Sequence, residues 1–545
     1  MIITMEQLLK QKLSKATPFM LLDEGKLDEG IFAFWKYLKT VNFLFKTKKK
    51  AKKEFISKLK KLAQNYHKNK DYKSAITCYF NIYKLDKNNE ENIKNYITCL
   101  KEINQNDLEE ALAKYLVKLN PTKDNFKILA QSYSDNKNYE KAIDAYKKYL
   151  NKDNLVGIDY SWFGYFYFCL YKETFIEQYA KTALNYFLKA NEIQETKETI
   201  KNITSSANQS RKYFIELKFW KKYLKLVNDD EIPEDDKYRI SLCAMKCGDF
   251  ALWERFYNSR FKLPEGGAYY PDIKKPKYNS KLNIKNKTLL VHYEQGFGDT
   301  IFCFGYADRL KKLCKKLIFV VQDELVELLK NNDLGIEIYS KSTNLETIDF
   351  DYHLPMMDVT LALKISKNTS LIENSYVHAP KEGVEKYKKE FFNTPKLKVG
   401  ISLSGNKKGE QKRDVPHEFI KIFDKAKNVQ YYCLTKDTDD YKIDKIFKHN
   451  KIINIAKSFK NFSDTACAIE NMDIVISSDN CILNLAGAMG KKVIGLFNHC
   501  YNPRWININK ENSGFFASVL PIVNEKENEW ENTVKKALDI IQNIK

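Results

Sequence analysis

The sequence predicts an α + α/β protein, with a helical N-terminal half followed by two domains in which strands and helices alternate. Apolar residues at helical spacing continue to about residue 260, and the glycine-containing stretch Pro264–Pro271 interrupts that pattern. Short apolar runs separated by helical segments begin near residue 286, which predicts parallel sheets with crossover helices. We therefore expect three domains, at residues 1–265, 286–385 and 396–545.

Length and composition exclude several classes of protein. The chain of 545 residues is too long for a single core. Its net charge of +21 comes mostly from lysines spread along predicted helix faces, and no nucleic-acid-binding motif accompanies it, so we expect no nucleic acid partner. The 11 scattered cysteines favour reduced thiols. With no signal-peptide pattern and no apolar run of 18 residues, the sequence predicts a cytoplasmic protein.

A repeat emerges from residue 56 in the helical half. Two units share one internal spacing and are offset by 67 residues, about two periods of a 34-residue repeat. Their members are Leu62, Ala63, Tyr66, Ala75, Tyr79 and Ile82, and then Leu129, Ala130, Tyr133, Ala142, Tyr146 and Tyr149. The pattern resembles tetratricopeptide repeats, in which small residues lie where paired helices cross. That resemblance implies an α-solenoid whose concave face binds a protein or peptide; a scaffold or an oligomerisation arm is the alternative.

Nine strands are expected in the second half of the chain. They are Leu289–His292, Leu317–Gln322, Glu337–Tyr339, Tyr352–Leu354, Lys398–Ser402, Gln430–Leu434, Ile452–Asn454, Ile474–Ser477 and Lys492–Phe497. The segment 379–395 would join the two sheets, and the final helix, Glu529–Ile544, is expected to pack back on the first sheet.

A glycine turn follows the first of these strands. Gly296 and Gly298 allow close backbone approach to a ligand, but the third glycine of a dinucleotide fingerprint is missing. Asp299 in the same turn is either a helix cap or a general base in a cleft at the carboxyl ends of the strands.

Three stretches of the second sheet have the chemistry of an anion site. Ser404 and Gly405 follow a strand and lead through a basic loop to Arg413, a combination that suits a phosphate. Asp479 and Asn480 end another strand where a helix rich in Ala and Gly begins. Further on, Arg504–Trp505 could clamp a ligand or stabilise a surface loop.

These stretches together resemble a known family, the GT-B glycosyltransferases related to the bacterial heptosyltransferases (glycosyltransferase family 9-like), in the branch that carries tetratricopeptide repeats. The matching segments occur in family order and cover most of residues 286–510. They are Glu294–Ile301, Val399–Asn406, Arg413–Pro416, Asp464–Ala466, Ile476–Asn480, Leu485–Gly490 and Asn502–Trp505.

The resemblance implies two Rossmann-like domains with a cleft between them, the first being the acceptor domain and the second holding most of the nucleotide-sugar donor. Asp299 matches the acid that deprotonates the acceptor hydroxyl for direct inverting displacement. Donor-binding residues would be Ser404, Gly405, Arg413, Lys436, Asp479, Asn480 and Asn484. Acceptor or cleft residues would be Glu294, Gln295, Gly296, Gly298, Arg504 and Trp505.

Two positions depart from the family pattern. Asn480 stands where Thr or Ser is common, and Asn484 stands where His is common, which removes a titratable group. No Asp-x-Asp pair stands where a GT-A enzyme would hold a metal, so we expect a metal-independent reaction without a cofactor.

The expected partners are a nucleotide-sugar and a protein acceptor of the flagellin type, held by the solenoid. A lipid-linked or lipopolysaccharide acceptor, which would bring the basic surface to an anionic membrane, is one alternative, and an inactive binding scaffold is another.

Overall fold

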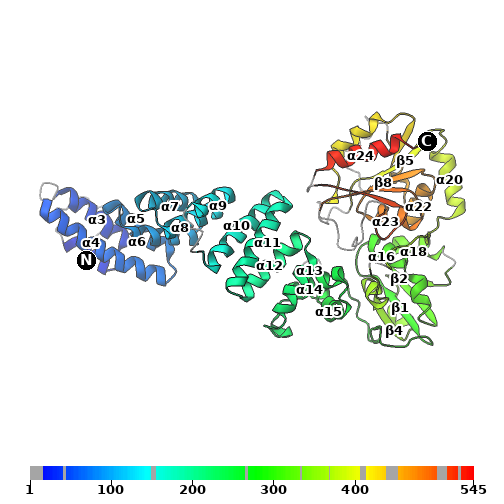
Figure 1. The fold of residues 1–545 in the computed structure, drawn as a ribbon, viewed down its shortest axis with the longest axis horizontal. Helices are drawn as coiled ribbons and strands as arrows, with labels where there is room; N and C mark the ends of the chain where they lie inside the picture. Colours follow the sequence, from blue (N-terminus) through cyan, green and yellow to red (C-terminus); the bar gives the residue numbers. More distant parts are fainter. Residues whose placement is uncertain are drawn as a thin grey trace. The chain divides into compact units, whose positions relative to one another are not determined.

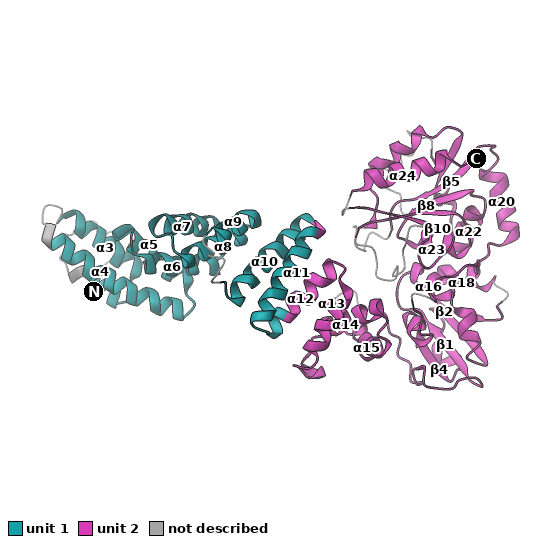
Figure 2. Cartoon of the chain, in the orientation of Figure 1, with its two compact units in different colours: residues 1–174, 178–199 teal, residues 175–177, 200–545 magenta. Residues whose placement is uncertain are grey.

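A computed structural model describes residues 16–40, 45–148, 155–263, 268–331, 334–366, 369–405, 413–436, 452–499, 512–525 and 529–544. The chain divides into two compact units. The first comprises residues 1–174 and 178–199, and the second residues 175–177 and 200–545 (Figure 2). Residues 200–263, the last part of the predicted solenoid, therefore belong to the same unit as the sheets.

The first unit is a stack of helices that pack in sequence order. From α4 to α10 each helix contacts the next along the chain (Figure 1). The small residues predicted at the crossings, Ala63, Ala75, Ala130 and Ala142, are fully buried. The helices are α2 (Ala16–Asp23), α3 (Leu27–Thr40), α4 (Phe45–Lys68), α5 (Tyr72–Leu85), α6 (Glu90–Glu102), α7 (Asn106–Leu119), α8 (Lys123–Asp135), α9 (Tyr139–Lys147), α10 (Gly157–Thr174) and α11 (Glu177–Ile193).

The turns between paired helices repeat at the level of the backbone. After α4, α6 and α8 the chain passes through a residue with positive φ, namely Lys70, Asn104 and Lys137. The residue that follows the positive-φ position bonds back to the last turn of the helix: Asp71 N–H to Tyr66 O is 2.9 Å, and Asn138 N–H to Tyr133 O is 2.8 Å. This bond satisfies helix-end carbonyls in the manner of a Schellman turn. A recurring turn confirms that this region is a helical repeat.

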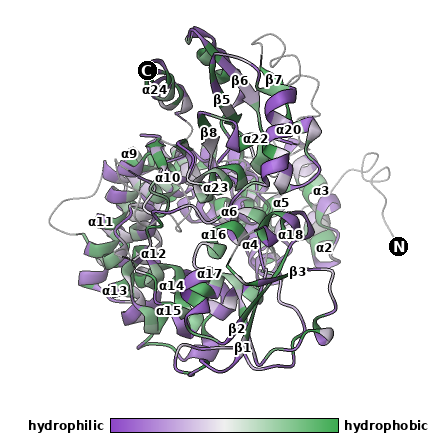
Figure 3. Cartoon of the chain, turned by 90° about the vertical axis from the view of Figure 1, so that its right-hand side faces the viewer, coloured by the Kyte–Doolittle hydropathy of each residue, from purple (hydrophilic) through white to green (hydrophobic). Residues whose placement is uncertain are grey.

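The division between the units falls within α12 (Lys197–Gln209), and the second unit continues with α13 (Tyr213–Tyr223), α14 (Glu234–Cys247), α15 (Phe250–Phe256) and the short helix η3 (Tyr257–Phe261). Green and purple stretches lie side by side on these helices in Figure 3, the amphipathic pattern expected of helices that cover a core on one face. Buried Trp220 and Trp253 contribute to that core.

The first α/β domain is a four-stranded parallel sheet in the order β3-β2-β1-β4. Its strands are β1 (Thr288–His292), β2 (Lys316–Val321), β3 (Glu337–Ser340) and β4 (Tyr352–Pro355). The helices between them are α16 (Phe297–Phe304), α17 (Ala307–Lys311) and α18 (Asp323–Lys330), with η4 (Leu345–Thr347), η5 (Met356–Asp358) and α19 (Val359–Ala362) flanking β4.

The second α/β domain is a six-stranded parallel sheet in the order β10-β9-β8-β5-β6-β7. Its strands are β5 (Leu397–Ser402), β6 (Val429–Cys433), β7 (Ile453–Asn454), β8 (Ile474–Ser478), β9 (Val493–Phe497) and β10 (Val519–Val523). All nine expected strands are present. β10 was not expected, because Pro521 interrupts its apolar pattern; as an edge strand it tolerates a proline.

The remaining helices are α20 (Lys381–Phe391), η7 (His417–Lys425), η8 (Ala456–Ser458), α22 (Phe462–Glu470), α23 (Cys481–Ala488) and α24 (Trp530–Gln542). The expectation that the final helix packs on the first sheet is wrong. α24 contacts η7, β9 and β10, and its buried Trp530 and Leu538 share a core cluster with Ile401 and Ile494 of the second sheet. Within the predicted joining segment, α20 packs against α22.

Candidate active site

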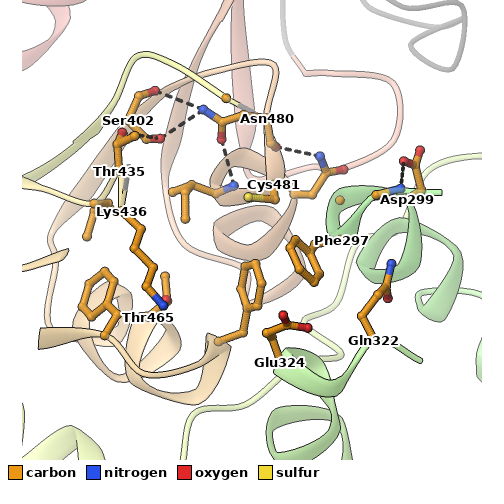
Figure 4. Close-up of a pocket in the computed structure, with 18 of the residues that line it drawn as sticks. Phe297, Asp299, Gln322, Glu324, Ser402, Thr435, Lys436, Thr465, Asn480 and Cys481 are labelled. Carbon is orange, nitrogen blue, oxygen red and sulfur yellow. Dashed lines mark hydrogen bonds between the residues drawn. The ribbon is translucent and has the colours of Figure 1, made fainter. Parts of the chain in front are cut away.

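The glycine turn after β1 places Asp299 in the first turn of α16. Gly296 begins the helix, and the Asp299 carboxylate accepts a hydrogen bond of 3.1 Å from the Gly296 N–H (Figure 4). Asp299 therefore closes the helix start, as the capping interpretation predicted. It also lines a cavity, so capping and a chemical role are compatible.

Gln322, at the end of β2, braces this turn from the neighbouring strand. Its Nε2 donates to the Gln295 carbonyl at 2.8 Å, and its Oε1 accepts from the Thr300 hydroxyl at 2.8 Å. Gln322 and Thr300 are both buried. The two bonds fix the loop on one side of Asp299 and the helix on the other. Sequence reasoning assigned Gln322 only to a strand, although a polar side chain at a strand's carboxyl end is a signal for a site.

The turn after β5 is held in a similar way. The Asp414 carboxylate accepts the Gly405 N–H at 2.9 Å and so ties the two ends of the basic loop together. Burial raises the pKa of Asp414, and the Gly405 N–H opposes that rise. Asp414 lines the cavity and was not among the predicted donor-binding residues, although it lies in the matching segment Arg413–Pro416.

Asn480 joins the ends of β5 and β8. Its Oδ1 caps α23 by accepting from the Ile482 N–H at 2.8 Å. Its Nδ2 donates to Ser402 Oγ at 3.0 Å and to the Ser404 carbonyl at 3.2 Å. Both polar atoms of the side chain are thus engaged within the protein, and Asn480 shapes the site by holding two of its loops together.

Asn461 begins α22 in the same backbone conformation as Asn480 at the start of α23. Its Oδ1 accepts from the Ser463 N–H at 2.8 Å, and its Nδ2 donates to Glu327 of α18 at 2.7 Å. The bond to Glu327 links the two α/β domains. A ring contact between Phe297 and Phe462, with centroids 4.9 Å apart, adds a second link beside it.

Gly298 permits a third contact between the two α/β domains, where the start of α16 meets the start of α23. A Cβ at Gly298 would lie 3.1 Å from Asn484 Nδ2, closer than side chains normally pack, and 3.4 Å from the Cys481 Cα, in ordinary contact. The absence of a side chain at this position therefore sets how closely the two helix starts approach each other.

One cavity of about 700 Å³ lies between the two α/β domains. Figure 4 shows Asp299, Gln322 and Glu324 on one side, with Ser402, Thr435, Lys436 and Asn480 on the other. The N-terminal ends of α16, α22 and α23 all contribute residues to its lining, together with the cations Lys341, Arg413, Lys436 and Lys460. Helix N-termini and cations favour an anionic ligand.

Most predicted site residues that the structure describes line this cavity. They are Gln295, Gly296, Gly298, Asp299, Ser404, Gly405, Arg413, Lys436, Asp479, Asn480 and Asn484. Arg504 and Trp505 lie outside the described residues.

Glu294 does not line the cavity, so its predicted place in the cleft needs correction. Its carboxylate is buried and accepts two hydrogen bonds of 2.9 Å from Arg260 of η3. The same guanidinium donates to Asp358 at 2.7 Å, and Asp358 also pairs with Lys277. Burial raises the pKa of Glu294, and Arg260 opposes the rise. Glu294 therefore anchors the helical segment to the first sheet.

Two buried histidines adjoin this network. His292 of β1 and His353 of β4 face each other, with Nε2 and Nδ1 3.3 Å apart, and the Tyr270 hydroxyl lies 3.4 Å from the other ring nitrogen of His353. Burial lowers the pKa of each histidine to about 4, so both are neutral at neutral pH.

Within the part of the chain that the structure describes, no helix is long and apolar enough to span a bilayer, and no three His, Cys, Asp or Glu side chains are grouped so that they could hold a metal.

No protein-family model matches the chain, and no curated protein matches it. Similar solved structures include a glycosyl transferase family 9 protein of Veillonella parvula, which is 10% identical with a TM-score of 0.36 and covers 48% of this chain and 92% of its own. The dodecameric, iron-containing glycosyltransferase TibC of enterotoxigenic E. coli is 12% identical with a TM-score of 0.32, covering 46% and 67%. The MamA protein is 19% identical with a TM-score of 0.28, covering 32% and 91%. At these TM-scores the likeness is weak and partial.

Proposed function

We propose that the chain is a GT-B glycosyltransferase that moves a sugar from a nucleotide donor to an acceptor hydroxyl. The observation that carries the proposal is that Asp299 and the loops after β5 and β8 line one cavity. Parallel-sheet domains bind ligands at the carboxyl ends of their strands, and both sets of residues follow such ends.

The second domain offers the chemistry that a donor diphosphate needs. The starts of α22 and α23 face the cavity, and Arg413, Lys436 and Lys460 lie in its wall. Backbone N–H groups at a helix start and long cationic side chains both stabilise phosphate oxygens. They would bind the diphosphate and also stabilise the negative charge that develops on it as it leaves.

Asp299 would act as the general base on the opposite wall. Its carboxylate takes the proton of the acceptor hydroxyl while the hydroxyl oxygen attacks the anomeric carbon. The bond from that carbon to the diphosphate oxygen breaks, and the nucleoside diphosphate leaves with the bonding electrons. Attack opposite the leaving group inverts the anomeric centre. The braces from Gly296 and Gln322 hold the base in place for this step.

A protein acceptor fits a chain whose first half is a helical repeat, because stacked helix pairs offer an extended binding surface. A lipid-linked saccharide is the second candidate acceptor, favoured by the net charge of +21, which would attract an anionic membrane. An inactive scaffold is the remaining alternative, since Asn484 lacks the titratable group that is common at its position in the family.

Donor binding gives the first test. The full chain is screened by thermal shift against UDP-, GDP-, ADP- and CMP-sugars, and a donor at a hundred times its dissociation constant should stabilise the protein by about 2.7 kcal/mol. If no nucleotide-sugar stabilises the chain and none is hydrolysed, the transferase proposal fails.

Transfer gives the second test. Radiolabelled donor is incubated with the full chain and either a lysate protein fraction or a lipid extract. Label in protein supports the protein acceptor, and label in lipid supports the alternative. Asp299→Asn should reduce transfer at least about 100-fold, as expected when a general base is lost. Asp323→Asn is the matched control, because Asp323 also begins a helix of this domain but bonds Ser340 and Ser342 outside the cavity. Equal activity of the two variants would remove Asp299 from the mechanism.

A further inference from the structure

Asn484 presents an unusual polar group to the cavity. It lies in the first turn of α23, lines the cavity and is only 2% exposed. Its Nδ2 donates a hydrogen bond of 2.8 Å to the Asn480 carbonyl, one turn earlier. This bond fixes which end of the amide is nitrogen and leaves Oδ1 as the other end.

The Oδ1 atom of Asn484 is buried and has no hydrogen-bond partner among the residues that the structure describes. Buried polar atoms are almost always paired, so an unpaired carbonyl oxygen in a cavity wall points to a partner supplied by a ligand. That partner must be a hydrogen-bond donor, because a carbonyl oxygen only accepts.

This requirement excludes the diphosphate as the partner. Ionised phosphate oxygens only accept hydrogen bonds, so they would repel Asn484 Oδ1, whereas the helix-start N–H groups and the lysines attract them. The remaining polar groups of a nucleotide-sugar that can donate are the hydroxyl and amide N–H groups of the sugar and ribose, and the N–H groups of the base.

The position of Asn484 selects among these groups. Asn484 lies against Gly298, where a Cβ would come within 3.1 Å of its Nδ2, and Gly298 directly precedes Asp299. A ligand group at Asn484 is therefore beside the turn that carries the base. The part of the donor that must approach the base is the transferred sugar.

We propose that Asn484 determines specificity by accepting a hydrogen bond from a hydroxyl or amide N–H of the transferred sugar, an inference that rests on the proposed glycosyltransferase function. Asn480 supports this role by holding the amide in its orientation. The consequence is a divided site, in which the positive end of α23 and the neighbouring cations attract the phosphate and the side chain of Asn484 binds the sugar.

The experiment compares two probes, the best nucleotide-sugar from the donor screen and the matching nucleoside diphosphate, by calorimetry on the full chain. Asn484→Ala should weaken nucleotide-sugar binding about 10- to 100-fold and leave diphosphate binding within about twofold, because only the sugar contact is lost. Asn484→Leu, which keeps the volume and admits no replacing water, should behave in the same way. Asn461→Ala is the matched control: its polar atoms are engaged by Ser463 and Glu327, so it should not weaken the sugar-bearing probe selectively.

Deoxy analogues of the donor sugar show which sugar hydroxyl, if any, donates the hydrogen bond to Asn484. One deoxy analogue should bind wild type about 10-fold more weakly but bind Asn484→Ala as well as the parent sugar does. Equal losses for both probes in Asn484→Ala and Asn484→Leu, or no loss for either, would overturn the assignment of Asn484 and leave the proposed transferase intact. If wild type binds none of the probes, the transferase proposal and this assignment fail together.

Discussion

The buried ion triad of Arg260, Glu294 and Asp358 allows a demanding test of how the helical segment is joined to the first sheet. Arg260→Met removes the guanidinium and leaves two buried carboxylates, both less than 5% exposed, with Lys277 as the remaining cation of the network. Breaking a buried charge pair by deleting one partner costs about 3–5 kcal/mol. We therefore expect a loss of that size in the local stability of the segment that carries Glu294.

Hydrogen exchange of the β1 amides measures this loss directly, because it reports the free energy of local opening. At tenfold per 1.4 kcal/mol, 3–5 kcal/mol corresponds to exchange roughly 100- to 4,000-fold faster. Arg255→Met is the matched control, since Arg255 pairs with Asp229 at 2.8 Å but both side chains are about half exposed. An exposed pair contributes about 1 kcal/mol or less, so exchange in the control should change less than about fivefold.

Adding Glu294→Gln to Arg260→Met should restore part of the loss, because it removes one uncompensated carboxylate. The loss in Arg260→Met should also shrink at acid pH, since burial already raises the pKa of Glu294 and the protonated carboxyl needs no cation. If Arg260→Met accelerates exchange no more than Arg255→Met does, the triad does not anchor the segment and this reasoning is refuted.

Three further predictions follow from contacts of the same unit. The stability of the first α/β domain should fall as pH drops from 6.5 to 4, by up to about 3.4 kcal/mol for each of His292 and His353, because the unfolded chain binds protons before the buried rings, whose pKa is about 4. Hydrogen exchange across this range measures the slope, and an unchanged slope in His353→Gln would contradict it. Asn480→Ala should lower the stability of the ligand-free second domain by about 1–3 kcal/mol through the lost cap and the lost bonds to Ser402, and a thermal unfolding midpoint equal to that of wild type would disprove its bridging role. Gly298→Ala should lower the rate of sugar transfer strongly and change the free energy of unfolding little. The added methyl group would press on Asn484 and separate the starts of α16 and α23. A wild-type transfer rate in this variant would show that their close approach is not required.

The sequence predicted the sheets well because parallel strands buried on both faces read as continuous apolar runs, of which β8, buried along its whole length, is an example. It predicted the glycine turn for a related reason, since the strand, the glycines and the acid are adjacent in the chain. β10 was not predicted because it contains Pro521, and proline is unusual in a strand and acceptable only at the edge of a sheet. α24 was assigned to the wrong sheet because an amphipathic helix shows which face is buried but not which partner buries it.

The residues of the site could be predicted where they are neighbours in sequence, and not where distant segments meet. Glu294 was grouped with the glycine turn because it precedes it, yet its partner is Arg260, 34 residues away. Asn480 was expected to touch the donor, which stays a prediction; the bond from its side chain to Ser402, 78 residues away, was not foreseen. Gln322 acts on a turn 27 residues before it. Such pairings depend on strand order, which the alternation of strands and helices leaves open.

The recurring turns of the first unit have a consequence for how that unit comes apart. From α4 to α10, each helix packs on its immediate neighbours along the chain. In a stack of this kind each helix is stabilised only by its neighbours, so local unfolding starts at an end and proceeds inward one helix at a time. Amide exchange should therefore be graded along the row and slowest near its middle. A substitution at one turn, such as Asn104→Pro, should interrupt the gradient of exchange rates at that turn, because the helices on each side would then unfold independently.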